Sequence, residues 1–363
     1  MTANRRNGSV DCCRLLAAIG VVLVHLAPSS DRAEVLTRPF HAFAVPFFFV
    51  ISLYFFISRV SALDAVSLRD LRLDRLCVPY AVWSAVYTSV QFVRISLGGT
   101  DHIIDTVGFI FFGGGAIHLY FLSLLVLFQA QALVLVLVYR SPANRLAAFA
   151  FAAGIMMIGY VGSSELYFGM EDGLKEGWLY SGLALILVWM QGGVLGRKIN
   201  LAAGYVTVGL VIWLAPYGLW QSPFIGYGIA GLALNVRVPA SSAAIKYITS
   251  CSYGIYLAHF AFLQGFQYAA QKIGHPLTPY TVPTKAATAV VICTCCLGFI
   301  WIARLHRVTA YLFLGESLKP RPPAQVVPVL PTRELPGADT AFNRASEQIS
   351  ILGSPLNCER THP

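Results

Sequence analysis

Long apolar stretches recur along most of the chain, and they constrain its fold more than any other feature. Crossing the hydrocarbon core of a bilayer takes a helix of about 20 apolar residues. Of the 363 residues, 56% are hydrophobic and only 12% are charged, which is about half the charge of an ordinary soluble domain. The stretches do not alternate between polar and apolar residues, as the strands of a transmembrane β-barrel do. The sequence therefore predicts an all-α fold, a polytopic bundle of membrane helices.

The basic residues predict how the chain crosses the membrane. Lys and Arg are enriched in every second connection between apolar stretches, which places those connections in the cytoplasm. The net charge of +9 is thereby explained by topology, and it does not indicate a nucleic-acid partner. We expect both termini in the cytoplasm and ten transmembrane helices, at residues 12–28, 39–58, 77–97, 117–138, 146–163, 178–196, 201–219, 221–236, 247–269 and 283–305.

The two ends of the chain differ in character from the apolar part. Residues 1–11 are expected to form a cytoplasmic N-terminus and residues 12–305 the transmembrane domain. Residues 306–363 are expected to form a cytoplasmic tail that is largely disordered, because KPRPPAQVVPVLPTRELPG (319–337) is rich in proline and has no helical period. The eight cysteines lack the spacing of a zinc site. We therefore expect neither a metal nor a bound cofactor.

The first apolar stretch carries a polar stripe. In RLLAAIGVVLVH, Arg14 and His25 are eleven residues apart, so they share one helix face and lie about 16 Å apart along the axis. Asp11 lies nearly one turn before Arg14, close to the same face. Ionisable groups at membrane depth normally face a bundle interior or a wet cavity. The plainer alternatives are that Arg14 is only a topology signal at a helix end and that His25 is an interfacial histidine bonded to a carbonyl.

Two more histidines lie in or next to apolar stretches. GGGAIHLYFL (113–122) places His118 at the start of the predicted fourth helix, and SYGIYLAHF (252–260) places His259 within the ninth. In the ten-helix topology these two and His25 could converge near the outer half of the bundle. The alternative is three unrelated histidines, each satisfied by its own surroundings.

A second polar group is basic and cytoplasmic. In SLRDLRLDRLCVPY (67–80), Arg69, Arg72 and Arg75 are spaced by three. Guanidinium groups bind phosphate bidentately, so this edge would suit an anionic cytosolic ligand such as coenzyme A. On spacing alone, positive-inside charge is the stronger interpretation.

Taken in order, five segments resemble the acyltransferase-3 family, membrane acyltransferases that modify surface polysaccharides and other glycans. They are DCCRLLAAIGVVLVH (11–25), AVPFFFVISLY (44–54), RLDRLCVPY (72–80), HLYFL (118–122) and SYGIYLAH (252–259). The resemblance covers residue 11 to about residue 305, and the Arg–His pair of the first segment is its most specific mark. The chain departs from the family at Leu53, where glycine often follows the serine, and at Tyr120, where tryptophan is usual.

The resemblance implies an enzyme of the bacterial inner membrane that uses acyl-CoA as co-substrate. The acyl group, usually acetyl, would pass to a hydroxyl of a polysaccharide, another glycan or a lipid-linked sugar. Carried over by position, His25 would be the catalytic histidine, Arg14 its partner and Arg75 the basic residue before the third helix. We expect Arg75 and Arg72 to bind the donor, with Arg14 helping to hold it. The further site candidates are His118, His259, Ser52 and Asp11.

The leading alternative is a secondary transporter of a small polar substrate, since membrane histidines and arginines also build proton relays. Against it, Asp11, Glu165, Asp172 and Glu316 all fall near helix ends or in loops. Proton-coupled carriers usually place a carboxylate within a span. The sequence therefore favours the enzyme.

Overall fold

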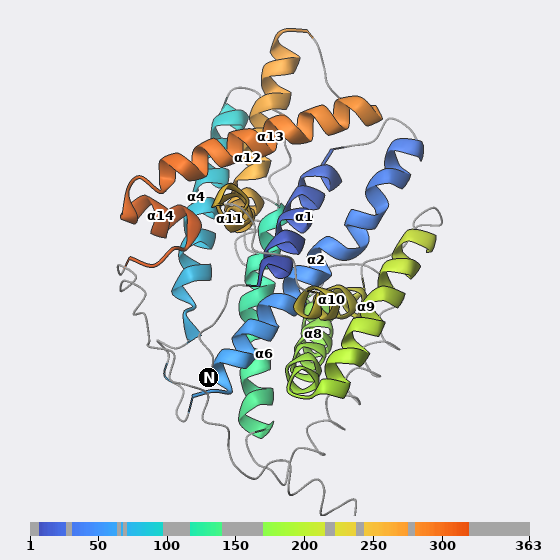
Figure 1. The fold of residues 1–363 in the computed structure, drawn as a ribbon. Helices are drawn as coiled ribbons and strands as arrows, with labels where there is room; N and C mark the ends of the chain where they lie inside the picture. The colour runs from blue at the N-terminus through green and yellow to red at the C-terminus, as the bar shows by residue number, and fades with distance from the viewer. Residues whose placement is uncertain are drawn as a thin grey trace, which may run out of the picture. The chain divides into compact units, whose positions relative to one another are not determined.

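The computed structural model describes residues 7–26, 31–63, 67, 71–96, 117–139, 170–214, 222–236, 243–274 and 280–318. Every regular element in these ranges is a helix, so the all-α prediction is confirmed (Figure 1). The elements are α1 (Gly8–Val24), α2 (Asp31–Val60), α4 (Asp74–Ser96), the short 3₁₀ helix η1 (Ile117–Leu119), α6 (Tyr120–Tyr139), α8 (Met170–Gln191), α9 (Val194–Leu214), α10 (Pro223–Asn235), α11 (Ala243–Ser250), α12 (Ser252–Lys272), α13 (Val282–Ala303) and α14 (Arg307–Leu314).

Within the described residues, three helical segments are long and apolar enough to cross a membrane: Thr37–Val60, Tyr120–Val138 and Val282–Ala303. A shorter apolar segment lies in α8. Helix α10 has 13 residues, about 20 Å at 1.5 Å per residue, which is less than the hydrocarbon thickness of about 30 Å. The expected span at 146–163 lies outside the described residues. The count of ten helices and the cytoplasmic termini stay predictions.

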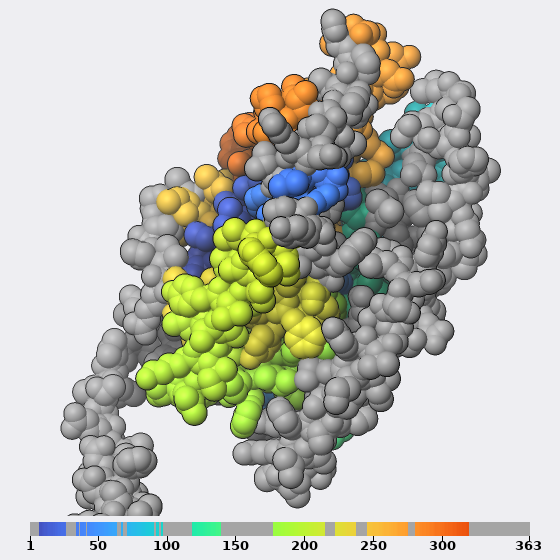
Figure 2. All heavy atoms as spheres, turned by 90° about the vertical axis from the view of Figure 1, so that its right-hand side faces the viewer, coloured from blue at the N-terminus to red at the C-terminus, as the bar shows by residue number. Residues whose placement is uncertain are grey.

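The surface of α9 is the kind that lipid covers. Leu195, Val206, Ile212 and Trp213 are each more than 60% exposed, and Figure 2 shows this helix, in yellow-green, on an open face of the molecule. Apolar side chains exposed along a whole helix are unfavourable in water and favourable against acyl chains. The exposed face of α9 thus agrees with the membrane character that the composition predicts.

Helix α2 lies among α1, α6, α8 and α10, which all pack against it. Phe47, Ile51 and Ile57 in its second half are completely buried. Gly226 of α10 lies directly against the carbonyl of Pro46, where a Cβ would be 2.4 Å from the oxygen. Because no side chain fits there, this close crossing of α2 and α10 depends on glycine.

Hydrogen bonds fix the start of α1 against the end of α10. The Asn7 side chain caps α1 by accepting from the backbone N–H groups of Ser9 and Val10. The same side chain donates to the carbonyl of Leu234 at 3.4 Å, and the Ser9 hydroxyl donates to that of Val236. These bonds set the position of α1 along its axis, and with it the places of Arg14 and His25.

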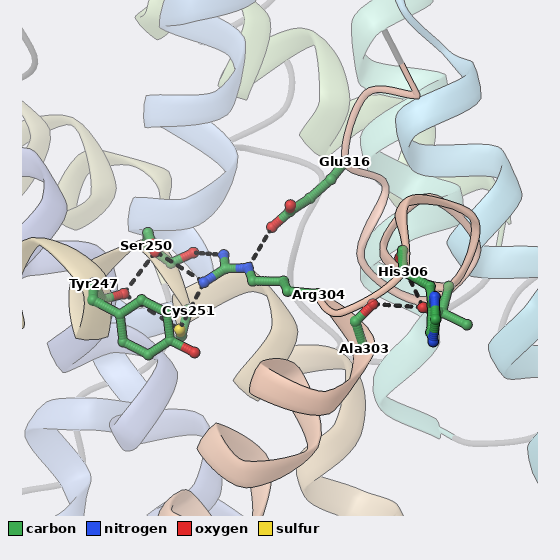
Figure 3. A network of polar contacts seen from close by, with 8 residues as sticks. Tyr247, Ser250, Cys251, Ala303, Arg304, His306 and Glu316 are labelled. Carbon is green, nitrogen blue, oxygen red and sulfur yellow. Dashed lines mark hydrogen bonds and ion pairs between the residues drawn. The ribbon is translucent and has the colours of Figure 1, made fainter. Parts of the chain in front are cut away.

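A cluster of polar contacts around Arg304 anchors the end of α13 (Figure 3). The Nε of Arg304 lies 2.7 Å from a carboxylate oxygen of Glu316, and its Nη1 donates to the Ser250 hydroxyl at 3.2 Å. The guanidinium also lies over the ring of Tyr247, 5.4 Å from the centroid. The cluster ties together α11, the end of α13 and the segment after α14.

Helix α14 packs on α4 through a glycine. Gly315 ends α14 in the left-handed conformation, with φ of 63°, and a Cβ there would be 2.3 Å from the carbonyl oxygen of Arg75. Trp83 of α4 donates its indole N–H to the carbonyl of Phe313 at 3.0 Å. Residues 307–318, which the sequence analysis assigns to the tail, therefore include a short helix packed next to Arg75.

Candidate active site

Three helical elements bring three histidines together. His25 is the C-cap of α1, His118 lies in η1 and His259 lies in α12. The ring centroids of His118 and His259 are 4.9 Å apart, those of His25 and His259 5.3 Å, and those of His25 and His118 6.2 Å. The rings are close enough for their nitrogens to act on one small group.

The surroundings of His259 determine which of its nitrogens carries the proton. Its Nδ1 lies 2.7 Å from the carbonyl oxygen of Tyr256. Because a carbonyl oxygen only accepts, Nδ1 is the protonated nitrogen of the neutral ring, and Nε2 keeps its lone pair. Among the described residues, the buried Nε2 has no hydrogen-bond partner. His259 therefore offers an acceptor inside the bundle.

His118 is 2% exposed, and within the described part of the chain neither of its ring nitrogens makes a hydrogen bond of ordinary geometry. The carbonyl of Leu257, which accepts the hydroxyl of Tyr87, is also near the His118 ring. Buried polar atoms are normally satisfied, so unpaired ones point to a bound group. The described ranges contain no cluster of metal-ligating side chains that could hold a metal ion.

Two tyrosines support the histidines, and the sequence analysis did not name them. The Tyr256 hydroxyl donates to the backbone carbonyl of His118. The Tyr87 hydroxyl donates to the Leu257 carbonyl at 3.0 Å and accepts from the Ala261 N–H at 3.1 Å. Leu257 and Ala261 are one turn apart in α12, on either side of His259. Tyr87 thus holds the helical turn that carries this histidine.

A small pocket opens beside the histidines. Its volume is about 80 Å³, and its polar lining is His25, His118, Tyr120 and Tyr256. A buried water needs about 10–15 Å³ by the same measure, so the pocket holds a group larger than a single water. Its position next to two of the three histidines makes it the place where a reacting group can bind.

The basic candidates lie away from the histidines. Arg14 is about 16 Å before His25 along α1, with its guanidinium 5.1 Å from the Phe55 ring centroid. Arg75 lies in the first turn of α4, about 18 Å before Tyr87. Arg14 lies in the second turn of α1 and Arg75 in the first turn of α4, and each helix reaches the region of the histidines about three turns after its arginine.

The remaining candidates are not in the histidine cluster. Arg72 lies just before α4 with φ of 51°, a left-handed conformation that non-glycine residues seldom adopt. Asp11 is in the first turn of α1, and Ser52 is half-buried in α2.

Apolar helices surround three histidines, two of them buried, with a pocket beside them, and these features agree with a membrane protein that has a candidate site for proton transfer. The acyltransferase-3 family, described as an acyltransferase domain, matches residues 7–303. The chain belongs to this family and is a membrane acyltransferase. No curated protein and no solved structure matches it.

Proposed function

We propose that this enzyme moves an acyl group, acetyl in the first instance, from acyl-CoA to a hydroxyl of a glycan. The acceptor would be a cell-surface or exported polysaccharide, or a lipid-linked sugar, and the enzyme would cross the bacterial inner membrane ten times. The observation that carries the proposal is the trio of histidines beside a pocket, in a chain of an acyltransferase family.

His25 would act as the general base. A sugar hydroxyl is a weak nucleophile at neutral pH, and a histidine within hydrogen-bond reach can take its proton as it attacks. The oxygen forms a bond to the thioester carbonyl carbon, and the carbon–sulfur bond breaks. The coenzyme A thiolate then takes a proton from the histidine, which returns to its neutral form. Attack by His25 itself, followed by transfer to the sugar, is the covalent version of the same reaction.

The other two histidines would hold the reacting groups. The Nδ1–H group of His259 donates a hydrogen bond to the carbonyl oxygen of Tyr256. The lone pair on Nε2 is therefore available to accept a hydrogen bond from the sugar hydroxyl or from His25. His118 has polar atoms without ordinary partners among the described residues. Preorganised groups of this kind speed transfer because they need no reorganisation during the reaction.

The separation between cations and histidines suits an elongated donor. Acyl-CoA has phosphates at one end and its thioester at the other. Arg14 in the second turn of α1, with Arg72 and Arg75 at the start of α4, would hold the phosphates, since guanidinium binds phosphate through paired hydrogen bonds. The arm of the donor would then run along these helices towards the histidines.

The direct test uses purified protein in detergent, acetyl-CoA labelled in the acetyl group, and a glycan fraction from the host. We expect label in the glycan, and none when the protein is omitted. Transport requires a sealed compartment and acyl transfer does not. Uptake of substrate into sealed vesicles, with no labelled glycan in detergent, would contradict the proposal.

Replacing Tyr87 by phenylalanine tests the support of His259. The change removes the hydroxyl that bridges Leu257 and Ala261, and a small misplacement of a catalytic group can cost about 100-fold in rate. We expect kcat to fall about 10- to 100-fold, while the KM for acyl-CoA stays the same because the donor phosphates bind elsewhere. The measurement is a full kinetic analysis with acyl-CoA as the varied substrate.

Tyr205→Phe is the matched control, because Tyr205 is exposed on α9 and has no part in the site. An unchanged kcat in Tyr87→Phe, or an equal loss in both variants, would show that the bridge does not serve catalysis.

A further inference from the structure

The pocket beside His25 is apolar over most of its lining. Besides the four polar residues, its walls are formed by Val21, Val24, Phe40, Ala44, Val45 and Phe121. They come from α1, α2 and α6, three helices of the bundle. The pocket therefore has one polar side, with the histidines, and a larger apolar side.

An apolar wall of this extent does not suit a sugar. A sugar ring carries several hydroxyls, and each of them costs free energy when it is buried without a hydrogen bond. The Tyr256 hydroxyl is already bonded to the His118 carbonyl, which reduces the polar lining further. An acyl group matches both sides of the pocket. Its carbonyl would lie at the histidines, and its methylene groups would lie against the apolar wall.

The size of the pocket limits such a chain. At about 80 Å³, it has room for about five to eight water-sized groups. That is enough for an acyl group of a few carbons and too little for the long chain of a fatty acid.

Phe40 is fixed firmly enough to set this limit. It packs on Gly20 of α1, where a Cβ would be 2.7 Å from its ring. On its own helix it contacts Phe43, with the ring centroids 5.9 Å apart. Phe40 is half-buried, and these two contacts restrict the movement of its ring. A longer acyl chain would meet the Phe40 ring.

We propose that this pocket is the acyl-binding subsite, and that Phe40 sets the longest acyl chain that the enzyme transfers. The proposal rests on the proposed function, because it assigns the acyl group of the same donor to a particular part of the site. The proposal predicts that the enzyme transfers short acyl groups and not long ones.

The test compares transfer from acetyl-, butyryl-, hexanoyl- and octanoyl-CoA by the wild type and by Phe40→Ala, in detergent. For the wild type we expect kcat/KM to fall steeply beyond the short chains. In Phe40→Ala the space of the ring becomes available to the acyl chain. We therefore expect the kcat/KM for hexanoyl-CoA, relative to that for acetyl-CoA, to rise at least about 10-fold. Burying about two more methylene groups of the acyl chain is enough to cause a rise of this size. Phe92→Ala, on an exposed position of α4, is the matched control.

A second variant works in the opposite direction. Ala44→Val narrows the pocket, so it should lower butyryl transfer relative to acetyl transfer, and it decides the matter if Phe40→Ala does not fold. The same chain-length profile in the wild type and in the folded variants would overturn the acyl subsite while leaving the transferase intact. Absence of transfer from every donor, in every folded protein, would overturn the proposed function itself.

Discussion

Replacing His25 by alanine is expected to lower kcat by about 100- to 10,000-fold, the range that a positioned acid–base group contributes. His25 belongs to the histidine cluster and lines the pocket, as His118 also does. The direct and the covalent mechanism both need its ring, so both predict this loss. The measurement is the transfer of label from acetyl-CoA to glycan at equal amounts of folded protein.

His306→Ala is the control for the loss of a histidine. His306 is exposed at the start of α14 and outside the cluster, so this variant should keep the wild-type rate. Transfer at the wild-type rate by His25→Ala would exclude both mechanisms and leave His259 as the next base to test.

Replacing Arg75 by alanine is expected to raise the KM for acyl-CoA about 10- to 100-fold. A hydrogen bond to a charged group contributes about 1.5–3 kcal/mol, which corresponds to about this factor. Helix α14 should stay docked, because Gly315 packs on the carbonyl of Arg75 and the side chain can be cut back without changing that contact. The kcat at saturating donor should change little, since Tyr87, whose ring contacts that of His118, lies about 18 Å further along α4.

The control removes a cation elsewhere. Arg197 is exposed on α9, which packs on α2, α8 and α10 and has no part in the histidine cluster. Arg197→Ala should leave the KM for acyl-CoA unchanged. A KM in Arg75→Ala equal to that of the wild type would remove this residue from donor binding.

Helical periodicity was enough to predict the polar stripe of α1. Arg14 and His25 lie on one helix, so their spacing fixes their relation whatever the rest of the fold. The meeting of His25 with His118 and His259 needed the topology as well, because the three belong to separate helices. The role of Tyr87 could not be predicted from the sequence. A tyrosine in an apolar run looks like any other aromatic residue of the core, and its hydrogen-bond partner Leu257 is 170 residues away.

Helix boundaries were harder to predict than helix content. The expected span at 178–196 runs across the end of α8 and into α9, which begins at Val194. The pair Gly192 and Gly193 interrupts the helix there, as glycines do where the chain leaves helical geometry. The apolar run YLFL followed by glycine was a helix-end signal in the tail, but α14 has only eight residues, and its packing on α4 is what stabilises it.

The docking of α14 has a consequence for the order in which the enzyme is built. Trp83 and Phe313 are 230 residues apart in sequence, so α4 is synthesised long before its partner helix. Segments fold as they emerge, and contacts over long separations form last. The start of α4, with Arg75, therefore reaches its final packing only after α14 has been synthesised, and a ribosome that stalls before residue 307 leaves this part of the enzyme without its partner helix.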